Sequence, residues 1–312
     1  MVKADAYNHG LEGVIHISDD VVDRYGVATL EEGINLRRLG INKPVSVFLY
    51  QNSDFNDVVK NRLTPVIYNE ETLKSILNSK HNDFELKIDT GMNRLGFKTQ
   101  ASINATFDKI FKAGLLPRAV HTHFYSKDSI RTQQLRYWRN LEPFKEVLLS
   151  TKKILSASQG ILNKEFSDGV RAGLIAYKNA LKVTSNVVEV KSVFRGESVG
   201  YEGKYKPKTN TTVALIAGGY YDGIRRAYAG AEAVINGKKT RIVGNVNMDS
   251  TFIEAGDIPL KIGDIVTLID SSTLESYVKV SNSTEYEVIT SIKGRAKRIY
   301  SYHGQKYDKV SY

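Results

Sequence analysis

The sequence predicts an α/β fold: a (β/α)8 TIM-type barrel with a truncated first strand, followed by a C-terminal all-β domain. Two observations support this prediction. Between residues 25 and 172, short β-branched runs alternate with longer amphipathic stretches, which is typical of βαβ units around a parallel sheet. After about residue 182 the amphipathic stretches stop, and strand-like runs are separated by turns of Gly, Asn and Asp. We therefore predict a barrel at residues 1–182 and a β domain at residues 183–312.

The barrel elements follow in order. A capping box of Thr29 and Glu32 predicts a helix through Arg38. Further helices are expected at residues 70–77, 101–113 and 129–149. Strands are expected at residues 25–28, 44–49, 64–68, 84–89, 118–124, 153–158 and 170–172, in addition to a stub at residues 1–4. Because eight strands close such a barrel, we expect the stub to be the end of the first strand, with its earlier part missing from this sequence.

In the β domain, strands are expected at residues 183–193, 211–216, 231–235, 241–245, 251–255 and 265–268. Asn236-Gly237 is a two-residue hairpin signal between two of them. The segment 178–185 is expected to link the two domains.

Composition narrows the class of protein. Hydrophobic residues make up 41% and charged residues 25% of the 312 residues, which is typical of a soluble globular protein. The absence of cysteine excludes disulfides and thiolate chemistry, and no signal-peptide pattern opens the chain, so we predict a cytoplasmic protein without a membrane span. The net charge of +10 raises nucleic-acid binding as an alternative, but the basic residues are scattered among acidic ones. We interpret this charge as attraction for anionic ligands.

Lys3 is the first candidate for chemistry. In a (β/α)8 barrel, catalytic groups lie at the C-terminal ends of the strands, where this sequence carries Lys3, Arg94, His123 and Arg171. Lysine forms Schiff bases with carbonyl cofactors such as pyridoxal phosphate (PLP). A solvated N-terminal lysine is the commoner interpretation of such a residue taken alone.

Six further motifs follow the Lys3 segment: Lys87-Ile88-Asp89-Thr90-Gly91-Met92-Asn93-Arg94, Thr122-His123-Phe124, Val170-Arg171-Ala172-Gly173, Val199-Gly200-Tyr201, Gly219-Tyr220-Tyr221-Asp222-Gly223 and Gly244-Asn245-Val246-Asn247-Met248-Asp249. Each is weak alone, but their order across both predicted domains is specific. Over nearly its whole length, the chain resembles the PLP-dependent alanine racemases. The resemblance implies an isomerase that interconverts L- and D-alanine for peptidoglycan and acts as a homodimer.

The resemblance implies two catalytic bases. Lys3 holds PLP as a Schiff base and, once released by the substrate, acts on one face of the α-carbon. Tyr201, supplied by the neighbouring subunit, acts on the other face, because racemisation removes a proton on one side and returns it on the other. A tyrosine in a Gly-rich β segment is otherwise more often a packing residue.

The resemblance also implies the cofactor contacts. Arg171 faces the pyridine nitrogen, to which a guanidinium can only donate, and His123 lies beside the ring. A surface salt bridge and a core histidine are the respective alternatives. The phosphate is expected to meet the Tyr7 hydroxyl and the backbone N–H groups near Gly173 and Leu174. Gln159 is a further candidate, since Ser158-Gln159 stands where the family has an Asn-Ser pair.

For the substrate, the resemblance implies that Arg94 contacts its carboxylate and the cofactor's phenolic oxygen. The backbone N–H of Met248 is expected to bind the same carboxylate from across the dimer. Lys87 matches a lysine that is carbamylated in many family members, where the new negative charge orients the arginine. Without that modification, Lys87 is a barrel-interior lysine that needs a partner.

Gly294 stands where typical alanine racemases have a tyrosine that narrows the pocket around the substrate methyl. We expect its absence to relax specificity, so that serine or another small amino acid is accepted. Two alternatives stay open. The chain could be a PLP-binding but inactive or impaired paralogue, because the N-terminal helix and most of the first strand are expected to be missing. The single-domain PLP-homeostasis proteins share the barrel lysine but lack a β domain, which disfavours them.

Overall fold

A computed structural model describes residues 1–155, 167–302 and 305–308. The chain divides into two compact units, which are described separately below. The first comprises Met1–Ala6 and Val14–Ala176, and the second comprises Tyr7–Gly13 and Tyr177–Tyr312. The predicted boundary between residues 182 and 183 stays a prediction.

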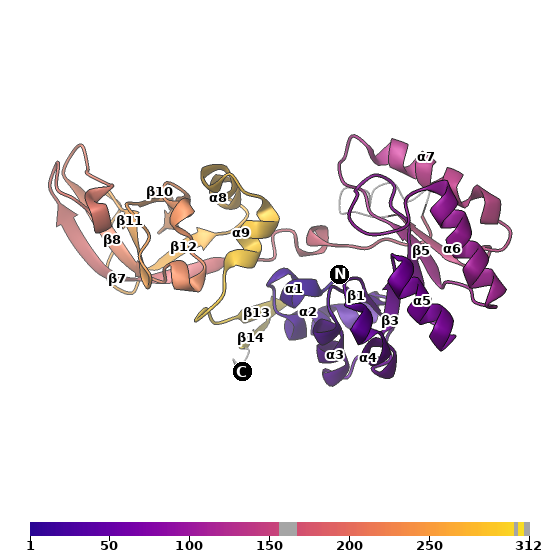
Figure 1. Ribbon diagram of the computed structural model, residues 1–312. Helices are drawn as coiled ribbons and strands as arrows, with labels where there is room; N and C mark the ends of the chain where they lie inside the picture. The colour runs from indigo at the N-terminus through magenta and orange to yellow at the C-terminus, as the bar shows by residue number, and fades with distance from the viewer. Residues whose placement is uncertain (156–166, 303–304, 309–312) are drawn as a thin grey trace. The chain divides into compact units, whose positions relative to one another are not determined.

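The first unit is built on a parallel sheet whose strands follow one another in sequence order (Figure 1). Its strands are β1 (Tyr25–Val27), β2 (Val45–Val47), β3 (Thr64–Ile67), β4 (Glu85–Lys87), β5 (Ala119–Thr122) and β6 (Lys152–Leu155). Nearly every strand residue is buried, as expected where helices cover a parallel sheet. In the register, Lys87 of β4 lies opposite His121 of β5. This arrangement is the one that the predicted barrel requires.

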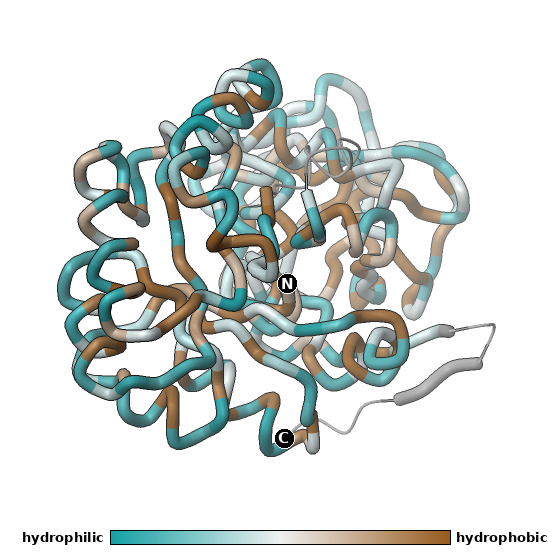
Figure 2. Tube along the Cα trace, turned by 90° about the vertical axis from the view of Figure 1, so that its right-hand side faces the viewer, coloured by the Kyte–Doolittle hydropathy of each residue, from teal (hydrophilic) through white to brown (hydrophobic). Residues whose placement is uncertain are grey.

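Helices connect these strands: α3 (Leu30–Arg38), α4 (Phe55–Lys60), α5 (Glu70–Ser79), α6 (Gln100–Lys112) and α7 (Ile130–Leu141). The predicted capping box is confirmed, since the Thr29 hydroxyl accepts from the Glu32 N–H and the Glu32 carboxylate accepts from the Thr29 N–H. Hydrophobic and hydrophilic residues alternate along the helices of the tube in Figure 2, as expected for helices with one face on a core. No helix in the described part of the chain has the length and apolarity needed to cross a bilayer.

Three local predictions in the first unit are wrong. Residues 170–172 and the stub at residues 1–4 are not strands, and the helix expected through residue 149 ends at Leu141. Single backbone hydrogen bonds replace the missing ladders: Met1 N to Ala172 O at 2.9 Å, Val2 N to Gly26 O at 2.9 Å, and Asp168 N to Lys153 O at 2.9 Å. These bonds link β6 to β1 through short extended segments that have too few paired residues to form strands.

The second unit contains a closed antiparallel barrel with the strand order β10-β11-β8-β7-β12-β9. The strands are β7 (Val183–Val193), β8 (Thr211–Ala217), β9 (Glu232–Ile235), β10 (Lys238–Val243), β11 (Ser250–Glu254) and β12 (Ile265–Ile269). The predicted hairpin is confirmed: β9 and β10 pair directly, and the turn residues Asn236 and Gly237 have φ values of 48° and 76°. Both values are left-handed, as a type I′ turn requires.

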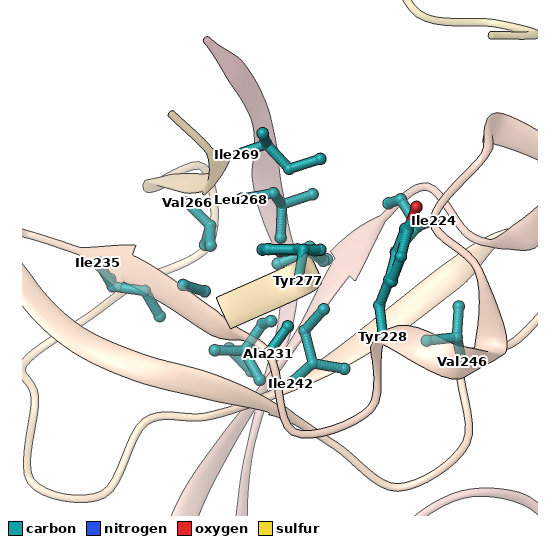
Figure 3. Packing of buried hydrophobic residues seen from close by; sticks show 14 of the residues in the cluster. Ile224, Tyr228, Ala231, Ile235, Ile242, Val246, Val266, Leu268, Ile269 and Tyr277 are labelled. Atoms are coloured by element: carbon teal, nitrogen blue, oxygen red, sulfur yellow. The ribbon is translucent and has the colours of Figure 1, made fainter. Parts of the chain in front are cut away.

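The core of this unit is formed by residues of the barrel strands and of the helix α8 (Leu274–Ser281), whose Tyr277 lies among the buried side chains labelled in Figure 3. Tyr228 and Tyr277 are fully buried there and pack edge to face, with ring centroids 5.0 Å apart. The sequence patterns predict no element after residue 268. The structure adds α8, α9 (Glu285–Ser291) and a hairpin of β13 (Ile299–Tyr302) and β14 (Gln305–Asp308).

Candidate active site

Lys3 begins a left-handed turn. The segment α1 (Lys3–Tyr7) has φ and ψ near +50° at Ala4, Asp5 and Ala6. Left-handed backbone costs about 1–2 kcal/mol for each residue with a side chain, so such a run persists only where other contacts hold it. Two of these contacts are the Ala4 N–H donating to Glu32 Oε1 at 2.6 Å and the Ala6 N–H donating to Val2 O at 2.9 Å. The backbone after Lys3 is therefore fixed by hydrogen bonds.

Lys87 occupies the end of β4 and is almost fully buried. The described residues place no carboxylate in an ion pair with its ammonium, which lies over the Phe48 ring, 5.8 Å from the ring centroid. Burial, together with the charges of Arg171, Arg94 and Lys3, lowers the pKa of Lys87 to about 7 against the opposing effect of Asp89. A large fraction of Lys87 is therefore a neutral amine near neutral pH.

Arg171 and His123 lie together. Arg171 Nη2 donates to the Thr122 carbonyl at 2.9 Å and lies 3.1 Å from His123 Nδ1. The guanidinium also lies over the Phe48 ring, 5.1 Å from its centroid. Lys87, Arg94 and His123 line one hollow with Thr122. The structure thus brings Lys87, Arg94, His123 and Arg171 to the C-terminal ends of neighbouring parallel strands.

Below this group lies a buried ionic network that the sequence analysis missed. Glu85 is fully buried on β4 and accepts hydrogen bonds from His121 Nε2 at 2.5 Å and Ser46 Oγ at 3.0 Å. Arg24 Nη1 pairs with the same carboxylate at 2.6 Å. The sequence signal for this network is a pair of ionisable residues within otherwise apolar strands. Glu85 and His121 each lie two residues before a predicted site residue, and therefore on the same face of the strand.

Tyr7, the predicted phosphate contact, is buried in the second unit. Its ring packs against Tyr177 at 5.4 Å and Tyr286 at 6.1 Å between centroids. The His9 ring stacks on the same Tyr177 ring, with the two centroids 4.7 Å apart. These three aromatic contacts fix the plane of the rings around Tyr7.

The remaining phosphate candidates belong to the first unit. Gly173 and Leu174 are buried, and the Gly173 carbonyl accepts from the Ala176 N–H at 3.0 Å at the start of a short 3-10 turn. Gln159 lies outside the described residues.

Tyr201 and Met248 come together in the second unit. Both line a hollow that also includes Glu202, Tyr220, Arg226 and Asn245. Tyr201 is 72% exposed and Met248 is 52% exposed, so neither side chain is covered by its own unit. The Asn245 side chain donates to the Tyr201 carbonyl at 3.0 Å and fixes the tyrosine's backbone to the Met248 loop.

Gly294 has a left-handed φ of 73°. A Cβ at this position would lie 3.0 Å from the Tyr221 carbonyl oxygen and 3.4 Å from Asp222 Oδ1. The local backbone therefore favours glycine and leaves little room for a side chain.

Comparisons with known proteins give these groups a common identity. The model of the alanine racemase N-terminal domain matches residues 1–180, and the model of the C-terminal domain matches residues 180–300. The chain belongs to the alanine racemase family. The alanine racemase of Pasteurella multocida is 30% identical over 95% of this chain and 89% of that relative. Alanine racemase 1 of Caldanaerobacter subterraneus is 29% identical over 100% of this chain and 90% of that relative.

Solved structures of the family agree. Alanine racemase of Clostridium difficile 630 superimposes with a TM-score of 0.87 at 27% identity, covering 98% of this chain and 89% of that one. The alanine racemase from E. faecalis gives a TM-score of 0.80 at 26% identity over 94% of this chain and 88% of that one. The predicted fold class and the predicted enzyme class, an alanine racemase, are confirmed. None of these matches favours the inactive paralogue.

Proposed function

We propose that this chain racemises alanine with PLP bound at Lys3, using Lys3 and Tyr201 as bases on opposite faces of the α-carbon. The observation that carries the proposal is the cluster of Lys87, Arg94, His123 and Arg171 around the strand ends next to the Lys3 turn, in which the two guanidinium groups stay positively charged. A cationic cluster of this kind fits an anionic cofactor that bears a phosphate and a phenolate. When bound, PLP supplies the electron sink that makes the α-hydrogen acidic.

The residues have separate tasks. Arg171 orients the ring nitrogen by donation, and because a guanidinium holds its proton, it leaves that nitrogen unprotonated. Arg94 and the Met248 N–H bind the substrate carboxylate. Tyr7 and the backbone near Gly173 and Leu174, with Gln159, bind phosphate. The neutral amine of Lys87 adds to carbon dioxide and releases one proton to the solvent, and the resulting anionic carbamate is a counter-charge for Arg94.

Tyr201 acts on a second copy of the chain in a homodimer. This proposal is supported by its 72% exposure and by Met248, which lines the same hollow and is expected to serve the same partner site. The enzyme acts in the cytoplasm, and its product, D-alanine, is used to build peptidoglycan. Gly294 relaxes specificity, so that serine competes with alanine.

Two variants test the mechanism. Lys3→Ala should abolish both the absorbance of a PLP–lysine Schiff base and racemisation. Tyr201→Phe should keep that absorbance but lower the racemisation rate by about 10²–10⁴-fold, the usual range for one acid–base group. In deuterated water, Tyr201→Phe should still exchange the α-hydrogen of one alanine enantiomer, because one base remains.

Tyr125→Phe is the matched control, since Tyr125 is an exposed tyrosine of the first unit with no proposed role. Exchange of both enantiomers by Tyr201→Phe at the wild-type rate would contradict the two-base proposal. For substrate range, kcat/KM is measured with L-alanine and L-serine. A strong preference for alanine would contradict the role given to Gly294.

A further inference from the structure

Arg295 contacts two other segments of the second unit, and one of them is the Met248 loop, residues 247–249. Its Nε and Nη2 donate to the two oxygens of Asp222 at 2.9 and 2.7 Å, and Nη2 also pairs with Asp249 Oδ1 at 2.9 Å. The guanidinium lies over the Tyr221 ring, 5.1 Å from its centroid. One side chain therefore holds the carboxylates that follow Tyr221 and Met248 in the sequence.

The two loops so connected are also joined through their backbones. The N–H groups of Gly218, Tyr220 and Tyr221 donate to the carbonyls of Asp249, Asn247 and Met248 at 2.8, 2.9 and 3.2 Å respectively. Gly219 makes this approach possible, since a Cβ there would lie 2.1 Å from the Asn247 carbonyl oxygen. Residues 218–221 therefore pack closely against the Met248 loop along its backbone.

The hydrogen bond from the Tyr220 N–H to the Asn247 carbonyl determines the direction of the Met248 N–H. The chain has no cis peptide bond among the described residues, and in a trans peptide the C=O and N–H point in opposite directions. The Asn247 carbonyl is directed at the Tyr220 N–H. The Met248 N–H, which belongs to the same peptide unit, is therefore directed away from residues 218–221.

We propose that Arg295 is a positioning residue for the substrate carboxylate, because it holds Asp222 and Asp249 together and so fixes the loop that presents the Met248 N–H. The inference rests on the proposed function, in which that N–H binds the carboxylate. Both aspartates share one nitrogen of Arg295, so their oxygens lie close together. Without the guanidinium, two like charges would face each other and push the loops apart.

The test compares Arg295→Gln with Arg225→Gln. Arg225 is the matched control, because it also lies in the second unit and pairs with one exposed carboxylate, Glu287, and neither residue lines the hollow around Met248. Arg295→Gln should raise KM for alanine about tenfold with kcat within about twofold of wild type, as expected when ground-state and transition-state binding are lost equally. Arg225→Gln should leave both constants unchanged. Melting temperatures report whether either variant has lost its fold.

Two further variants separate positioning from general stability. Arg295→Lys keeps the charge but cannot make the two-pronged contact with Asp222, so KM should be intermediate. Arg295→Gln/Asp249→Asn removes one of the facing charges and should recover part of the lost affinity. An unchanged KM in Arg295→Gln would overturn the inference, as would equal effects in Arg225→Gln or no recovery in the double variant. A wild-type protein that does not racemise alanine would instead refute the proposed function itself.

Discussion

Glu85 and Lys87 are two buried charges on one face of β4, two residues apart, yet their surroundings are opposite. Burial alone would raise the pKa of Glu85, but His121 and Arg24 outweigh it and hold that pKa below its usual range. Burial and the charges of Arg171 and Arg94 together lower the pKa of Lys87 to about 7. The partners, more than the depth of burial, decide which residue stays ionised.

This difference separates two layers of the barrel interior. In the lower layer, Arg24 Nη1, Ser46 Oγ and His121 Nε2 all contact the Glu85 carboxylate, and burial lowers the pKa of His121. In the upper layer, the charges of Arg171 and Arg94 lie near Lys87 and lower its pKa, and Asp89 opposes them. The lower layer is a structural network, whereas the upper layer is prepared for an anionic ligand or a modification that supplies negative charge.

The largest effect is expected from Glu85→Leu. It leaves Arg24 and His121 buried without the carboxylate, which should lower the free energy of unfolding by about 3–5 kcal/mol. Urea unfolding followed by the fluorescence of Trp138, the single tryptophan of the chain and a residue of α7 in the first unit, measures it. The triple variant Glu85→Leu/Arg24→Met/His121→Phe should recover most of the loss. If the triple variant is as unstable as Glu85→Leu, the network stabilises the fold through its packing and not through its charge balance.

The second prediction concerns pH and Lys87 in carbonate-free buffer. Between pH 7 and pH 10.5 the folded residue has lost its proton while the unfolded residue still holds it. The unfolded state then binds more protons, so stability increases with pH, by about 2 kcal/mol between pH 7.5 and pH 9. Lys87→Met should lose this contribution, so that the difference in unfolding free energy between the two proteins changes with pH. Parallel curves would contradict the depressed pKa.

These layers also mark the limit of what the sequence could predict. The Thr29–Glu32 capping box and the Asn236-Gly237 turn depend on neighbours in the chain, and both were predicted from residue types alone. The contact of Glu85 with His121 depends on the register of β4 and β5, and Arg295 meets Asp222 and Asp249 from a distant segment. The predictions of strands at residues 1–4 and 170–172 were wrong because single backbone hydrogen bonds hold these segments, which no local sequence pattern reveals.

A smaller effect is expected when one donor is removed from the lower layer. His121→Phe keeps a ring beside Phe48, whose centroid lies 5.6 Å from that of His121, but removes the hydrogen bond to Glu85. Arg24 and Ser46 still neutralise and solvate the carboxylate, so the loss should be about 1–2 kcal/mol. The same fluorescence measurement applies. A loss as large as that of Glu85→Leu would mean that His121, and not Arg24, is the main partner of the carboxylate.

The smallest effect is expected at the surface, where charge pairs are screened by water. Glu142 and Lys145 pair at 2.6 Å in the first unit, a distance equal to that between Arg24 and Glu85. Both side chains are more than half exposed, so Glu142→Gln should change the free energy of unfolding by less than about 0.5 kcal/mol. The two ion pairs have equal N–O distances, so a smaller loss of unfolding free energy in Glu142→Gln than in Glu85→Leu would show that an ionic partner matters most where water is excluded. Only there does an unpaired charge have no water to solvate it.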